Sequence, residues 1–116
     1  MDPTTAGGGS GIPPGVAVEQ IYVVEVTYGP DAERLRPAFR TEHLGRIARL
    51  MAEGRVIEAG GYLDFSTSLL LVRADSEEEA LNLFRNDVYV RNDVWTTLRA
   101  KPFGRVVIDA AQRATG

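Results

Sequence analysis

Leu69, Leu70, Leu71 and Val72 form an unbroken apolar run inside a strand that we predict over Ser68–Ala74. Neighbouring side chains of a strand point to opposite faces of its sheet, so this run indicates a strand that is covered on both faces. A chain of 116 residues offers only two predicted helices, and these cover one face. A second copy of the chain is the simplest cover for the other face, and we therefore predict a homodimer.

The order of the predicted elements indicates the fold class. Alternating apolar residues predict a first strand over Val16–Tyr28, and helical periodicity from Phe39 to Met51 predicts a helix that ends at Gly54. The remaining elements are a strand at Arg55–Leu63, the strand at Ser68–Ala74, a helix from Ser76 to about Asn86–Asp87, and a strand at Leu98–Asp109. This βαββαβ order predicts an α+β, ferredoxin-like fold, in which an antiparallel sheet carries both helices on one face.

Short motifs add detail to this outline. Ser76 and Glu79 have the spacing of a capping box, which predicts the start of the second helix. Pro37 fits the first turn of the first helix, and Pro102 favours an edge position or a bulge in the last strand. The paired glycines Gly60 and Gly61 predict a bulge or a close backbone approach. The segment Val88–Thr96 is expected to be an irregular arm with exposed aromatic side chains.

Composition limits the domain organisation and the function classes. Residues 1–15 are rich in Gly, Pro and Thr and predict a flexible leader; we expect one folded domain over 16–109 and a short tail over 110–116. The formal net charge of −3 argues against a nucleic-acid partner. No apolar run approaches the roughly 20 residues that span a bilayer, and no secretory signal is visible, so we expect a cytoplasmic protein without a membrane partner.

His43 is the only histidine of the chain. It lies in the apolar arc of the first predicted helix, with Phe39 four residues before it and Ile47 four residues after it, so its ring faces the interior or a pocket. An imidazole exchanges protons near neutral pH, which makes His43 the leading catalytic candidate. The alternative is a core histidine held by a backbone hydrogen bond. Arg40, on the same face, either extends outward to solvent or binds an anionic ligand.

Asp87 is the second catalytic candidate, because a carboxylate at the end of the second helix could orient an imidazole and stabilise its charged form. The alternative is an aspartate that only caps the next turn. Asp93 is a weaker candidate. We take Arg40 and three aromatic residues as candidate substrate-binding residues, the aromatics being Tyr22, Tyr89 and Trp95. One histidine and no cysteine make a transition-metal site improbable, so neither a metal nor a cofactor is predicted.

Short motifs of the sequence form a recognisable set, namely Glu42-His43-Leu44, Gly54–Gly61, Ser76–Ala80, Asn86–Tyr89 and Lys101-Pro102-Phe103. These motifs resemble those of the YCII-related (YciI-like) family of dimeric α+β barrel proteins, over roughly Gln20–Asp109. The resemblance implies dimers whose sheets pack face to face, and His43 with Asp87 as an active-site pair. This sequence has Val88 where the family usually has proline, and Gly60-Gly61 where it often has Gly-Pro.

The resemblance and the candidate residues lead to a functional hypothesis. We expect a cofactor-independent lyase or isomerase, in which His43 and Asp87 perform acid/base catalysis of an elimination, isomerisation or cyclisation of a small cyclic or aromatic metabolite. The alternative is a non-catalytic metabolite-binding or accessory protein of the same fold. A cofactor-free oxygenase of the same broad fold is a third interpretation.

Overall fold

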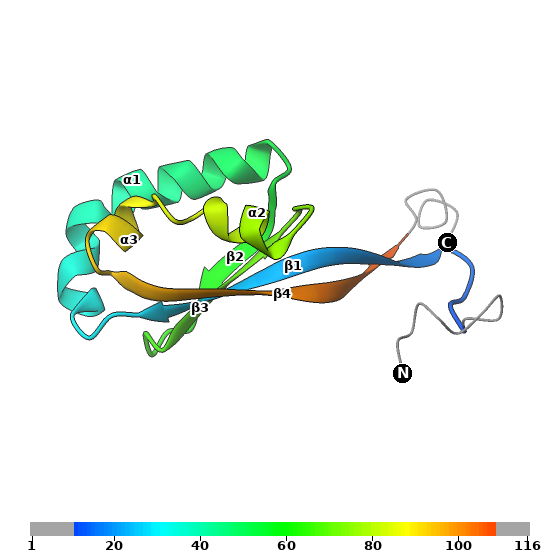
Figure 1. Cartoon of the computed structure of the whole chain (residues 1–116), viewed down its shortest axis with the longest axis horizontal. Coiled ribbons are helices and arrows are strands. Elements are labelled where there is room, and N and C mark those ends of the chain that lie inside the picture. Colours follow the sequence, from blue (N-terminus) through cyan, green and yellow to red (C-terminus); the bar gives the residue numbers. More distant parts are fainter. Residues whose placement is uncertain (1–10, 109–116) are drawn as a thin grey trace. The chain divides into compact units, whose positions relative to one another are not determined.

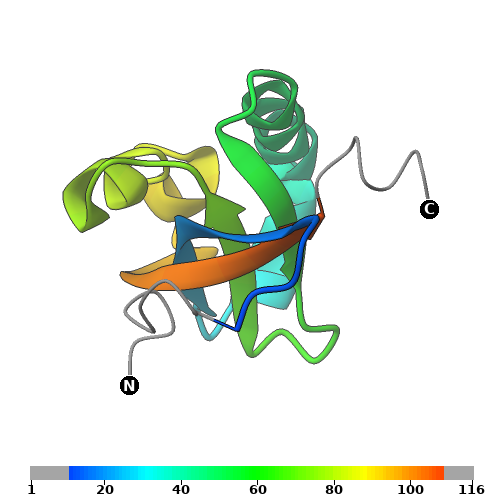
Figure 2. The same ribbon diagram turned by 90° about the vertical axis from the view of Figure 1, so that its right-hand side faces the viewer.

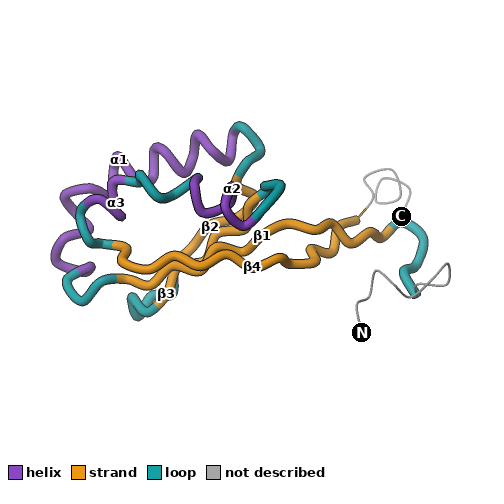
Figure 3. The backbone as a smooth tube through the Cα atoms, viewed as in Figure 1, coloured by secondary structure: helices purple, strands orange, loops and turns teal. Residues whose placement is uncertain are grey.

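The computed structural model describes residues 11–108. These residues divide into a larger compact unit, Ile21–Phe103, and a smaller unit with residues 11–20 and 104–108, in which Arg105 pairs with Glu19 at 2.9 Å. The elements, labelled in Figure 1 and coloured by type in Figure 3, are β1 (Val16–Tyr28), α1 (Ala32–Ala52), β2 (Val56–Gly61), β3 (Thr67–Val72), α2 (Glu77–Asn82), α3 (Val88–Arg91) and β4 (Trp95–Ile108).

The strands form one four-stranded sheet in the order β2-β3-β1-β4, in which β3 pairs antiparallel with both β1 and β2. The chain runs strand, helix, strand, strand, helical segment, strand, which confirms the predicted ferredoxin-like α+β fold. Viewed at right angles to Figure 1, α1 lies on one side and the segment with α2 and α3 on the other (Figure 2), and α1 contacts this segment through α3. The predicted leader 1–15 and tail 110–116 fall mostly or wholly outside the described residues.

The hydrophobic core of the larger unit joins the sheet to the helices. Alternate residues of β1 and β3 point into it, as the period of a strand requires, and burial of their side chains removes apolar surface from water. The sheet contributes the buried residues Val24, Val26, Leu70 and Val72, and the helices contribute Ile47, Leu50 and Ala80, with Phe84 added by the turn after α2. This packing holds α1 in a fixed position relative to the sheet.

The first helix begins earlier than the position of Pro37 suggested. The backbone N–H groups of Arg34 and Leu35 donate to the Asp31 carbonyl, so α1 starts at Ala32 and contains Pro37 in its interior. The proline stays because tertiary packing of the helix outweighs one missing backbone hydrogen bond. Gly54 lies just past the end of α1 with a φ of +78°, the left-handed conformation that favours glycine after a helix.

The expectation of an irregular, exposed arm over Val88–Thr96 was wrong. The segment contains the single-turn helix α3, and β4 already begins at Trp95. Tyr89 is 3% exposed and Trp95 is 2% exposed, so both aromatic side chains belong to the interior. A four-residue helix is too short to show a periodic pattern, so no sequence signal indicated it.

In the glycine pair of β2, close approach and not a bulge explains Gly61, whereas a Cβ atom on Gly60 would meet no atom within 4 Å. The register shift in β2 lies between Val56 and Glu58. A Cβ atom built on Gly61 would lie 2.5 Å from the hydroxyl oxygen of Tyr28, so only glycine leaves room for that phenol. Pro102 lies in β4, an edge strand of the sheet, as its missing N–H predicted.

The apolar run of β3 alternates in burial. Leu70 and Val72 are buried in the core, whereas Leu69 and Leu71 are only half-buried on the other face. The alternation agrees with a strand whose second face lacks full cover within one chain. Cover of that face by a second copy therefore stays a prediction.

Ser76 caps α2: its hydroxyl oxygen accepts a hydrogen bond from the Glu79 N–H at 3.1 Å, as the capping box predicted. Replacement of Ser76 by alanine leaves this N–H without its partner, so we expect Ser76→Ala to lower the free energy of unfolding by about 1 kcal/mol. Urea unfolding monitored by circular dichroism measures the change. Thr41→Ala, at an exposed position inside α1, is the control and should not destabilise the chain. An unchanged Ser76→Ala midpoint would contradict the capping role.

Candidate active site

His43 and Asp87 meet in the structure. The carboxylate Oδ2 of Asp87 lies 2.7 Å from Nδ1 of His43, a buried side-chain hydrogen bond across 44 positions of sequence. His43 comes from the middle of α1, and Asp87 is the N-cap residue of α3, where it also accepts from the N–H of Tyr89 at 2.9 Å. His43 is 5% exposed and Asp87 0%. The pair therefore links the two helices through a contact that excludes water.

Arg46 binds the second oxygen of the same carboxylate. Its Nη1 donates to Oδ1 of Asp87 at 3.2 Å, and its Nη2 donates to the Leu83 carbonyl. Burial alone would raise the pKa of Asp87, but the hydrogen bonds from His43 and Tyr89 and the charges of His43 and Arg46 outweigh it, so the pKa lies below the ordinary value. Asp87 is therefore ionised at neutral pH and serves only as a hydrogen-bond acceptor.

The ring of His43 is fixed by its neighbours as well as by Asp87. It stacks on Tyr89, with the ring centroids 3.7 Å apart and the planes 9° from parallel, and Trp95 meets it edge-on at 4.7 Å. Because an ionised carboxylate cannot donate, Nδ1 of His43 must carry the hydrogen of the shared bond. Nε2 is then the nitrogen that is left to accept or release a proton.

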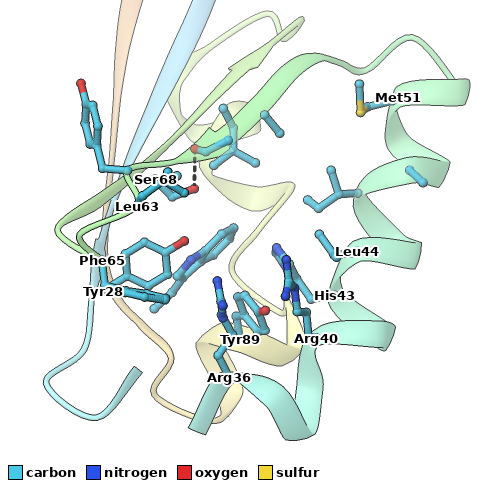
Figure 4. A pocket seen from close by; sticks show the side chains of 18 residues that line it. Tyr28, Arg36, Arg40, His43, Leu44, Met51, Leu63, Phe65, Ser68 and Tyr89 are labelled. Atoms are coloured by element: carbon cyan, nitrogen blue, oxygen red, sulfur yellow. Dashed lines mark hydrogen bonds between the residues drawn. The ribbon is translucent and has the colours of Figure 1, made fainter. Parts of the chain in front are cut away.

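His43 lines a cavity of about 530 Å³ between α1 and the sheet (Figure 4). One face of α1 supplies a wall, with side chains spaced three or four residues apart, and the opposite wall comes from β1, β2, β3 and the β2–β3 turn. This size falls within the range that holds small organic ligands. The lining side chains that bear on its chemistry are Tyr28, Arg36, Arg40, His43, Phe65 and Tyr89.

Aromatic groups and arginines stand together at the end of the cavity near His43. Arg36 places its guanidinium 4.5 Å from the ring centroid of Phe65, and Phe65 meets Tyr28 edge-on at 5.7 Å. Burial raises the pKa of Tyr89, against the lowering effect of the nearby Arg36 charge, so this phenol stays protonated at neutral pH. These groups offer flat surfaces for stacking together with hydrogen-bond donors.

The structure brings together most of the candidate residues but not all of them. Arg40, Tyr89 and Trp95 line the cavity with His43, and Asp87 lies behind the histidine. Tyr22 does not line it: this residue is 9% exposed and packs in the hydrophobic core, opposite Val72 in the pairing of β1 with β3. Strand periodicity placed Tyr22 and Tyr28 on one face but could not tell which of them lies beside a cavity.

Two arginines of the site were not singled out by the sequence. Arg36 lies one turn before Arg40 on the cavity face of α1, and that four-residue spacing was the available signal. Arg46 lay on the polar side of the predicted helix, and nothing in the sequence linked it to Asp87.

Among the described residues, no group of three or more histidine, cysteine or acidic side chains could hold a metal ion. None of the helices described is both long and apolar enough to cross a bilayer.

A ferredoxin-like sheet with a buried histidine–aspartate pair beside a cavity defines the class of this protein. The chain belongs to the YCII-related domain family, whose model matches residues 21–104. It is 27% identical over 95 residues to an uncharacterized protein of Haemophilus influenzae, and this alignment covers 73% of this chain and 97% of the relative. The fold is also that of 5-chloro-2-hydroxyhydroquinone dehydrochlorinase from Burkholderia phenoliruptrix in complex with 2,5-dihydroxybenzoquinone (TM-score 0.62, 17% identity, 72% of this chain and 92% of the other).

The lowered pKa of Asp87 has a consequence for stability. Because the pKa is lower in the folded chain than in the unfolded one, ionised Asp87 stabilises the fold fully above its ordinary pKa of about 3.9, and this contribution is lost as the pH falls through the lowered value. We expect Asp87→Asn to lower the free energy of unfolding by about 2 kcal/mol at pH ~7, and this deficit to shrink toward pH ~3.

Urea unfolding of both proteins between pH ~3 and ~7 measures this deficit. Asp75→Asn is the matched control, because it removes the same charge at an exposed position. A deficit that stays constant across the whole pH range would contradict the assignment of a stabilising carboxylate to Asp87.

Proposed function

We propose that this protein is a small-molecule enzyme in which His43 and Asp87 act as an acid/base pair. One observation carries the proposal: the only histidine of the chain forms the wall of a cavity, and its Nδ1 is held at 2.7 Å by a buried, ionised carboxylate. The same bond orients the ring and stabilises the imidazolium that forms when Nε2 takes a proton. Asp87 itself acts through His43, since it does not line the cavity.

The reaction classes that suit this pair move a proton between two positions of one substrate. Nε2 of His43 removes a proton from a ring carbon or hydroxyl, and the electron pair left behind forms a double bond, shifts it, or attacks another atom of the same molecule. Imidazolium then returns the proton to the leaving group or to a new carbon. Elimination, isomerisation and cyclisation follow this scheme without an oxidant or reductant. General acid–base catalysis of this kind accelerates a reaction typically about 10²–10⁴-fold.

A small cyclic or aromatic metabolite is the substrate class that the cavity favours. Tyr28, Phe65 and Tyr89 give the cavity flat aromatic surfaces, and its volume of about 530 Å³ fits a single substituted ring. The structural neighbour from Burkholderia phenoliruptrix adds support, since it is a dehydrochlorinase observed with 2,5-dihydroxybenzoquinone. Loss of hydrogen chloride is an elimination, one of the three reaction classes above.

A non-catalytic metabolite-binding protein is the second candidate. It is favoured by the burial of His43, which is 5% exposed and packs against the rings of both Tyr89 and Trp95, as a structural histidine would. In that case the cavity would hold the same ligand class, and His43 would fix its wall. The two candidates differ in turnover and not in binding.

The test uses a panel of chlorinated hydroquinones and hydroxylated quinones, with 2,5-dihydroxybenzoquinone as the binding probe. We expect His43→Ala to lower turnover of any active compound by about 10²–10⁴-fold, because the proton acceptor is lost, while the probe still binds. His43→Gln, which fills more of the space, guards against a folding defect. Release of chloride and the ultraviolet spectrum of the product measure turnover.

Thr41→Ala, two positions away on the exposed side of α1, is the control and should turn over normally. A His43→Ala protein with wild-type turnover would rule out the acid/base role. Binding of the probe by the wild type with no turnover of any compound would favour the binding protein.

We also propose that the protein acts as a homodimer, with the sheet face that carries Leu69 and Leu71 against its copy. Half-burial of these two leucines in one chain supports this arrangement, as does the dimeric barrel that the resemblance to the YCII-related family implies. We expect Leu71→Glu to convert a dimer into a monomer, because it would bury a charge in the interface. Multi-angle light scattering measures the mass. Leu44→Glu, at an exposed position of α1, should stay dimeric, and a wild-type monomer would contradict the proposal.

A further inference from the structure

We propose that the cavity takes a planar organic anion, and that the anionic oxygen of this ligand lies at the end formed by Arg36, Arg40 and His43. The inference rests on the function proposed above and adds the charge class of the ligand, an aryl carboxylate or an ionised phenol. It follows from the charges of the cavity wall, from donors that lack acceptors, and from the way that polar and apolar residues are distributed along α1.

The charge of the cavity wall is opposite to that of the chain. The formal net charge of the protein is −3, yet the cavity is lined by two arginines and a histidine, and no aspartate or glutamate of residues 11–108 lines it. Asp87, the nearest carboxylate of the site, lies behind His43, where His43 and Arg46 already bind it. A positive cavity in an acidic protein attracts anions and disfavours cations.

Arg36 and Arg40 are the arginines of the cavity wall, and across residues 11–108 neither has a carboxylate within ion-pair distance. Exposed Arg49 of the same helix also lacks one, whereas Arg34 and Arg46 pair with Asp31 and Asp87. The Nε of Arg36 is buried and has no hydrogen-bond acceptor in this part of the chain. Since buried donors normally find acceptors, the open positions around Arg36 indicate an acceptor supplied by a ligand.

Trp95 provides a second, independent sign of a ligand acceptor. It lines the cavity and is 2% exposed, and its indole Nε1 has no acceptor among the described residues. An indole nitrogen can only donate. Trp95 therefore joins Arg36 in the same cavity wall as a residue whose buried N–H has no acceptor, and both can bind oxygen atoms of one ligand.

The face of α1 that lines the cavity is polar at one end and apolar at the other. Arg36, Arg40 and His43 lie toward the start of the helix, and the lining residues that follow are Leu44, Ile47, Ala48 and Met51. Figure 4 shows Arg36, Arg40, His43 and Tyr89 grouped at one end of the cavity and Met51 far from them. A ligand that fits both ends has a charged group and an apolar body, and the rings of Tyr28, Phe65 and Tyr89 favour a flat one.

A matched pair of probes isolates the charge. Benzoate and benzamide have the same ring and nearly the same shape, but only benzoate carries a charge at neutral pH. We expect benzoate to bind at least about tenfold more tightly, because hydrogen bonds to charged groups are the stronger kind. The imidazole ¹⁵N signals of the single histidine give the titration curve without assignment. 4-Nitrophenolate in place of benzoate shows whether an ionised phenol or a carboxylate is preferred.

Variants then assign the effect to the two arginines. We expect Arg36→Gln and Arg40→Gln each to weaken benzoate binding about tenfold while benzamide binding stays unchanged. Arg40→Lys should retain more of the affinity than Arg40→Gln, and since Arg40 is exposed, neither change threatens the fold. Arg49→Gln is the matched control, because it removes the same charge from an exposed position of α1 outside the cavity wall.

Three results would overturn the inference: equal affinity for benzoate and benzamide, benzoate binding that survives in Arg36→Gln/Arg40→Gln, or no binding of any of the three probes. These outcomes are separate from a failure of the proposed function. Normal turnover in His43→Ala would end the acid/base role while leaving anion binding by the arginines in place. Equal binding of the two probes, with turnover still dependent on His43, would end the charge preference alone.

Discussion

The whole candidate site depends on the burial of one ionised carboxylate. A charge without solvent is costly unless several donors surround it, and Asp87 has three: the imidazole of His43, the backbone N–H of Tyr89 and the guanidinium of Arg46. Two of these donors, His43 and Arg46, come from α1 and the third comes from α3, so the carboxylate fixes where the two helices meet. Tyr89 contacts both members of the pair: its backbone N–H donates to Asp87, and its ring stacks on the ring of His43.

Much of the fold was accessible from the sequence because its signals are local. Strand periodicity gave β1 with its observed bounds, and the capping box at Ser76 gave the start of α2. The apolar run of β3 was assigned to the correct strand, although its burial alternates within one chain. The helix that carries His43 was also identified, but its start was placed too late, because Pro37 was taken as a first-turn residue while packing keeps it inside the helix.

Residues of the site were predicted only where their own type and position in the sequence pointed to a role. His43 stood out as the only histidine, and Asp87 was chosen for its place at the end of the predicted second helix and then paired with His43 by the resemblance to a family. Arg46 was beyond reach, because its role depends on a contact across 41 positions of sequence. Arg36 and Tyr22 show the limits of periodicity. A helical or strand period tells which face a residue occupies, but tertiary packing decides whether that face meets a cavity or a filled core.

The absence of a side chain at Gly61 also affects the width of the cavity beside His43. Tyr28 reaches to within 2.5 Å of the place where a methyl group on Gly61 would stand, and both residues belong to the cavity wall. Because Gly61 of β2 has only a hydrogen atom in place of a side chain, the phenol ring of Tyr28 on β1 can take its observed position. Any larger residue at this position would displace that ring and reshape the chamber from the side opposite α1. A substitution at Gly61 therefore changes the shape of the cavity without touching the histidine or its carboxylate.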